Sequence, residues 1–308
     1  MLTSLLMKSK KSIYFIVLVT LFSCGRQNPN TEDKPKEHDT VAATQDKSVA
    51  ISEAVMNDII QSIPSPVEMA SLIKESGVEF DRQIMNSSDK METYNTSFKK
   101  AFNIGVYGAD LGYINIYEKT YSAMNYVNAI KRLADDIKVG QFFNFETLKR
   151  LVSNNKNIDS IMYISTSGLN NMDNYLRQQK RGNLSVLMIS GAWLEALHIA
   201  CSVIKDKPIK EIVERIGEQK IILDNLMIVL RIYQDDAYFA NAIKLFDNIK
   251  KEFDQVTISY EYSQPEAKEV NGELVIVDNS RSQVNITPAL VNSITIIVDE
   301  VREKLTGL

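Results

Sequence analysis

Two long segments of the chain are apolar on nearly every side, and they constrain the fold more than any other feature. Residues 101–117 contain one charged side chain, Asp110, and residues 184–204 contain one acid, Glu195, together with His198. A helix that is apolar all round normally lies in the interior of a protein. The two segments therefore predict two central helices that the rest of the chain has to cover.

Helical periodicity and end signals predict the covering elements, and the short connections between them predict antiparallel neighbours. Ser65 and Pro66 have the residue types of an N-cap and a first helical position, and Gly77 is a stop signal. Thr120 is expected to cap the helix 120–140, and Gly217 is expected to weaken or break the helix that begins at residue 207. The predicted helices cover residues 65–77, 120–140, 158–180, 183–204, 207 onwards and 236–253.

The last fifty residues change character. The segment VTISYEY is rich in β-branched and aromatic residues, SQVNI suggests a further strand, and Asn271-Gly272 between two strand-like runs is a strong hairpin signal. The predicted fold is therefore mainly α. It is an antiparallel helical bundle or a set of stacked helical hairpins, with a small β region (256–286) and a final helix (288–305), all within one domain (51–308).

The N-terminus carries three lysines, an apolar run of ten residues (13–22) and then Cys24. The run is too short for a membrane-spanning helix, which needs about 20 residues, but it suits a secretory signal. The sequence LFSC that follows resembles the lipobox of bacterial lipoprotein precursors. The resemblance implies that residues 1–23 are a signal peptide, and that Cys24 is lipidated and anchors the mature chain to a membrane.

The segments YGADLGY and GAWLEALHIA are similar to those of helical lipoproteins of Gram-negative bacteria, a resemblance that implies no activity and no catalytic residue. It implies a place in the cell envelope, and Gly25 after the cysteine is compatible with the outer membrane. Residues 24–50 are polar and lack aromatic side chains, so they are expected to form a disordered tether with a reach of roughly 25–30 Å.

Charge and cysteine usage exclude several classes of protein. Removal of residues 1–23 takes three lysines away, so the formal net charge changes from −4 to −7. An acidic chain lacks the basic surface that nucleic-acid binding needs, and no nucleic-acid partner is expected. If Cys24 carries lipid, Cys201 has no partner for a disulfide within the chain.

The body contains one histidine, His198, and one cysteine, Cys201. This excludes Cys/His zinc sites, and no CxxC, GxGxxG, P-loop or GxSxG motif is present. Glu195 and His198 match half of a di-metal carboxylate site, but a second histidine is missing. We therefore expect no metal, no cofactor and no identifiable catalytic residue.

Isolated acids in core helices are candidates for a site, because burial of an unpaired carboxylate is costly. Asp110 shares one side of its helix with Tyr113 and Tyr117, and Glu195 shares a side of the other helix with His198. These five residues are the ligand-binding candidates, under the hypothesis that both sides face one cavity. A structural explanation is also open, in which the acids pair with Lys or Arg and the tyrosines are core residues.

The sequence favours a non-enzymatic envelope lipoprotein that binds a small ligand or a protein partner, held to a membrane by Cys24. Two alternatives are open. One is an enzyme that uses the carboxylates of Asp110 and Glu195 across a cleft, and the other is a pure structural scaffold.

Overall fold

The computed structural model describes residues 53–142, 144–147, 149, 158–205, 207–263, 266–270, 273–277 and 281–307. The chain divides into two units, residues 1–49 and residues 50–308, and the fold described below is that of the second unit. The predicted signal peptide (1–23), the lipidated Cys24 and the tether that runs to residue 50 lie outside the described residues.

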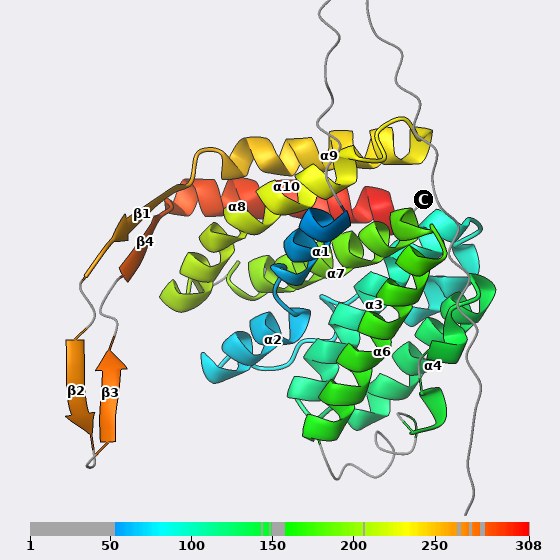
Figure 1. Ribbon diagram of the computed structural model, residues 1–308, viewed down its shortest axis with the longest axis horizontal. Helices are drawn as coiled ribbons and strands as arrows, with labels where there is room; N and C mark the ends of the chain where they lie inside the picture. The colour runs from blue at the N-terminus through cyan, green and yellow to red at the C-terminus, as the bar shows by residue number, and fades with distance from the viewer. Residues whose placement is uncertain are drawn as a thin grey trace, which may run out of the picture. The chain divides into compact units, whose positions relative to one another are not determined.

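The second unit is a mainly helical bundle with a small antiparallel β region and a final helix, which confirms the predicted fold class (Figure 1). Short 3-10 helices, η1 and η2, cover Ser88–Thr93 and Gly140–Phe142. The α-helices are α1 (Glu53–Gln61), α2 (Pro66–Glu75), α3 (Ser97–Ile116), α4 (Thr120–Asp136), α6 (Ile158–Gln178), α7 (Gly182–Val203), α8 (Lys210–Arg231), α9 (Ala237–Phe253) and α10 (Pro288–Thr306).

Helices α3 and α7 form the centre of the bundle, as their apolar sequences predict, and most of their residues are buried. Glycines let the two backbones touch. A Cβ atom on Gly105 of α3 would lie 1.8 Å from the carbonyl oxygen of Met188, and one on Gly191 of α7 would lie 2.0 Å from that of Phe102. Helix α7 is also long and apolar enough to cross a membrane, but most of it is buried in the body, as in the core helix of a soluble protein.

Two predicted helix signals are wrong. Thr120 lies in the first turn of α4, and Lys119 is the N-cap, without a side-chain cap bond. The chain leaves α3 in a tight turn in which Glu118 has a φ of 58° and the Lys119 N–H donates to the Ile114 carbonyl (3.0 Å). Gly217 does not break α8, which runs through it from Lys210 to Arg231, and the space where its side chain would lie is filled by another element.

That element is the β region, which consists of two antiparallel pairs of strands (Figure 1). Strand β1 (Thr257–Glu261) pairs with β4 (Arg281–Asn285), and β2 (Glu266–Val270) pairs with β3 (Glu273–Val277). The β2–β3 pairing agrees with the predicted hairpin, although the Asn271-Gly272 turn lies outside the described residues. Val284 of β4 packs on α8, where a Cβ atom on Gly217 would come within 2.3 Å of it.

Replacement of Gly105 by alanine is expected to destabilise the body by about 3 kcal/mol or more, because the new methyl group meets backbone that cannot move without separating α3 from α7. The same change at Gly108 of α3 is the control. Its Cβ atom would lie 3.2 Å from a flexible Leu169 methyl group, so we expect an effect within about 1 kcal/mol. Urea denaturation of residues 50–308, followed by circular dichroism, compares the two. Equal effects would contradict the close packing.

Candidate functional site

A buried ion pair joins the last helix to the central helix. Arg302 of α10 donates from Nε and Nη2 to the two carboxylate oxygens of Glu195 on α7, at 2.6 and 2.5 Å. The Glu195 side chain is completely buried and that of Arg302 is 14% exposed. Burial opposes the ionisation of Glu195, but Arg302 outweighs it and holds the pKa of this carboxyl below its ordinary value.

Asp110 of α3 is fully buried beside the same carboxylate. Its Oδ2 accepts a hydrogen bond from the Asn86 N–H (3.2 Å), whereas its Oδ1 meets no N–H or O–H donor among the described residues. Burial first, and then the charge of Glu195, raise the pKa of Asp110 well above its usual range. Below this raised pKa Asp110 carries a proton and can donate to the Glu195 carboxylate, so the cluster then holds one negative and one positive charge.

His198 lies one turn along α7 and binds the same part of the chain. Its Nε2 is 2.9 Å from the carbonyl oxygen of Ile84, to which Arg302 also donates (3.4 Å). Its Nδ1 is 2.8 Å from Oδ1 of Asp299 on α10, and Lys205 donates to the other oxygen of that carboxylate (2.7 Å). Both partners of the ring are acceptors, so both hydrogen bonds form together only when the ring carries both of its protons.

The candidate tyrosines bind the connection between α2 and η1, residues 78–87. The Tyr117 hydroxyl donates to the Val78 carbonyl (2.7 Å), and the Tyr113 hydroxyl accepts from the Asp81 N–H (3.1 Å). Both rings pack on Phe80. Farther along the connection, the hydroxyls of Tyr107 and Tyr126 donate to the carbonyls of Ser87 and Asn86, each at 2.9 Å.

The structure thus brings Asp110, Glu195 and His198 together and places Tyr113 and Tyr117 at the other end of the same connection. Each of the five candidates has a structural role, because each binds the backbone of residues 78–87 or a partner that does so. Asp110 and Glu195 touch directly in the interior, whereas the sequence hypothesis required a cavity between them.

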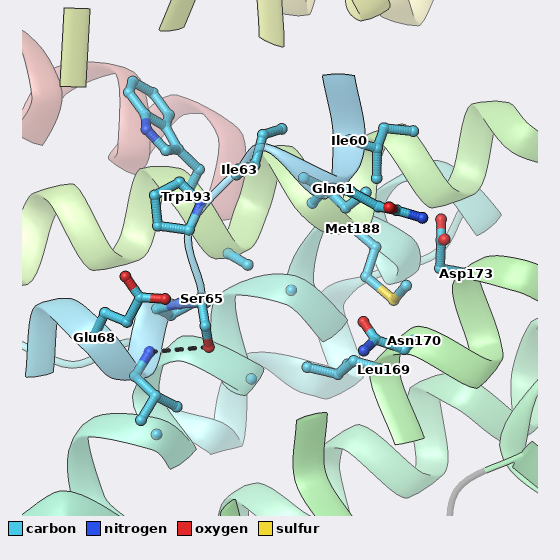
Figure 2. A pocket seen from close by; sticks show the side chains of 18 of the residues that line it. Ile60, Gln61, Ile63, Ser65, Glu68, Leu169, Asn170, Asp173, Met188 and Trp193 are labelled. Atoms are coloured by element: carbon cyan, nitrogen blue, oxygen red, sulfur yellow. Dashed lines mark hydrogen bonds between the residues drawn. The ribbon is translucent and has the colours of Figure 1, made fainter. Parts of the chain in front are cut away.

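A cleft of about 720 Å³ lies elsewhere in the body (Figure 2). One wall is the end of α1 with the start of α2, the opposite wall is α6, and the floor is formed by α3 and α7. None of the five candidates is among the residues that line it. The lining residues are 60–68, Gly105, Gly108, Gly112, Asn115, Leu169, Asn170, Asp173, Asn174, Arg177, Met188, Ile189, Ala192 and Trp193.

The wall formed by α6 is polar. Asn170, Asp173, Asn174 and Arg177 follow one another at helical spacing along the cleft. Arg177 forms an ion pair with Asp173, which also accepts a hydrogen bond from the Ser185 hydroxyl. Burial raises the pKa of Asp173, although Ser185 and Arg177 both act to lower it. This wall presents amide groups and a paired charge to the cleft.

Asn115, near the end of α3, is the most unusual lining residue. It is 5% exposed, it lies at the cleft, and its side chain makes no hydrogen bond to any residue that the structure describes. Among the described residues, the fully buried side-chain atoms without a partner belong to Asn86, Asn103 and Asp110, so the Asn115 amide is accessible from the cleft. Sequence reasoning missed Asn115 because it counted only charged residues in the apolar segment 101–117, and missed Asn170 and Asp173 because a polar face is typical of any surface helix.

Replacement of Asp110 by asparagine is expected to conserve the cluster, since Oδ1 of the new amide can accept from Asn86 and its Nδ2 can donate to Glu195. The raised pKa of Asp110 stabilises the native protein at low pH, and this contribution is lost as the pH rises from about 4 towards the folded-state pKa. The variant has no carboxyl to titrate at this position. Its free energy of unfolding therefore rises relative to that of the wild type by up to about 1.4 kcal/mol per pH unit over that window.

Urea denaturation at several pH values measures this difference. If the free energies of unfolding of the two proteins follow parallel curves against pH, the result contradicts a proton on Asp110. Glu195→Gln is the contrasting variant. It leaves the Arg302 guanidinium buried without a counter-charge, so we expect a loss of about 3–5 kcal/mol near neutral pH.

Comparisons of the chain with protein-family models, with curated proteins and with solved structures found no match. The buried cluster and the cleft are therefore the observations from which a function can be inferred. The acids of the cluster are completely buried, whereas the cleft is open and contains an amide without a hydrogen-bond partner among the described residues.

Proposed function

We propose that the chain is a lipid-anchored protein of the cell envelope whose helical body binds a small ligand in the cleft between α1, α2 and α6. The observation that carries the binding function is the cleft itself. Its volume of about 720 Å³ is typical of small-molecule sites, which range over about 300–1,000 Å³. It combines an aliphatic surface with a few convergent polar groups, as such sites do.

A binding role is favoured over an enzymatic one by the placement of the acids. A carboxylate pair that catalyses needs access for a substrate, and both Asp110 and Glu195 are completely buried. Asp173, the buried acid at the cleft, is engaged by Arg177 and Ser185. We infer that the cleft holds a molecule without transforming it.

The anchor is inferred from the N-terminal sequence. Two or more acyl chains on Cys24, each CH₂ contributing about 0.8 kcal/mol on burial, would hold the chain on a membrane. The residues that follow would then act as a tether between the membrane and the body.

Replacement of Cys24 by serine is expected to abolish lipidation, because serine lacks the thiol that carries the diacylglyceryl group. Cells that express the full chain are labelled with radioactive palmitate, and the label on the purified protein is measured. Cys201→Ala is the matched control, because this buried thiol is the other cysteine of the chain and should leave the label unchanged. Equal labelling of the Cys24→Ser variant would refute the anchor.

The binding function is tested by native mass spectrometry of residues 50–308, produced in the envelope of the source organism. We expect an added mass that disappears on denaturation and falls at least tenfold in Asn170→Phe, because the phenyl ring occupies the cleft. Asn171→Phe is the matched control, since Asn171 is the next residue of α6, is equally exposed and does not line the cleft.

A bare protein mass for the wild type would refute the proposal that this body carries a small ligand. Crosslinking in the envelope would then test the alternative, a protein partner.

A further inference from the structure

The non-polar surface of the cleft is aliphatic. Ile60, Ile63 and Val67 line it from the α1–α2 side, Leu169 from the wall formed by α6, and Met188 from the floor (Figure 2). The one aromatic group among the described lining residues is Trp193, whose Nε1 donates to Gln219 (2.9 Å) and whose ring packs against Phe246. Aliphatic groups of a ligand therefore fit this surface better than flat rings that need an open face for stacking.

The described charges at the cleft are one cation and two acids, of which one acid is paired with the cation. Among the described lining residues, the charged side chains are Glu68, Asp173 and Arg177. Asp173 and Arg177 neutralise each other, and their side chains are 11% and 10% exposed. Glu68 lies in the first turn of α2, where its charge complements the positive end of the helix dipole. An anionic ligand would thus enter the cleft without a free cation, at a cost in desolvation. A cationic ligand would meet only Glu68, which is exposed, and an ion pair with an exposed carboxylate contributes little.

The groups that remain for recognition are amides. Gln61 and Asn170 come from the two walls, and Asn115 lies on the floor with no hydrogen-bond partner among the described residues. Asn174 also lines the cleft, but its Oδ1 already accepts from Arg177 (3.2 Å). A side-chain amide offers both a donor and an acceptor, so it pairs best with a group that also offers both. The amide group is such a partner, and it carries no charge.

We infer that the ligand of the cleft is an aliphatic molecule with an uncharged amide group, and that Asn115 binds this amide. The inference rests on the proposed binding function and adds the chemical class of the ligand. Two sources share this chemistry, a short peptide segment with aliphatic side chains and a single-chain fatty amide.

Four probes test the inference by isothermal titration of residues 50–308, which form a separate unit with its own core. They are N-acetyl-leucyl-leucine amide, octanamide, octanoate and octylamine. Trp193 is the single tryptophan of the chain, so a change in its fluorescence shows that a probe binds at the cleft. We expect at least one uncharged amide to bind tenfold or more tightly than both octanoate and octylamine.

Asn115→Leu, which keeps the approximate volume of the side chain, is expected to weaken amide binding at least fivefold and to leave octanoate and octylamine unchanged. Asn171→Leu is the matched control on an exposed position outside the cleft. Tighter binding of the blocked dipeptide than of octanamide would identify a peptide as the source, and the reverse order would identify a fatty amide.

The inference is overturned if a charged probe binds as tightly as the amides, or if Asn115→Leu affects all probes equally. Either result leaves the binding function intact where native mass spectrometry finds an added mass that Asn170→Phe removes. Absence of both the added mass and any probe binding would refute the binding function and the ligand class together.

Discussion

The buried pair of Arg302 and Glu195 is the interaction on which the rest of the architecture depends. It joins residues 107 positions apart, from the final helix to the central one, in an interior where a lone charge of either sign would be very costly. One guanidinium balances one carboxylate, so the second acid in contact, Asp110, has to be neutral. The proton on Asp110 is therefore a consequence of packing α3, α7 and α10 around one cation.

The same cluster determines where the connection between α2 and η1 lies. Arg302 and His198 bind the Ile84 carbonyl, and Asp110 binds the Asn86 N–H. Tyrosines at the end of α3 and on α4 bind carbonyls on either side. Backbone groups in the interior need such partners, because each unpaired one is destabilising. A connection held in this way fixes the end of α2, and the start of α2 forms one wall of the cleft. The shape of the cleft thus depends on contacts in the core.

Much of the fold follows from local sequence, since apolar periodicity and end signals depend on residues close together in the chain. Helices α3 and α7 could be assigned to the centre because each segment is apolar on nearly every side, and the single acid in each then stood out as a site candidate. The ion-pair partner of Glu195 could not be found in this way, because Arg302 lies on an ordinary amphipathic helix and nothing near it in sequence marks it as buried. Helix α1 was not predicted, because its nine residues are too few to show a clear helical period in the sequence.

The cleft was also not predicted, because local sequence does not show which polar faces lie against another element. One residue, Asn115, did carry a signal. A row of amides and charges on α6 has the same pattern whether it faces water or an opposing wall, so only tertiary structure distinguishes the two. Asn115 differs, because it lies in a segment that is apolar nearly all round. A polar side chain in such a segment is as exceptional as an acid, because its hydrogen-bonding groups need a partner or water. A search of apolar helices for neutral polar residues, as well as for charges, would have led to the floor of the cleft.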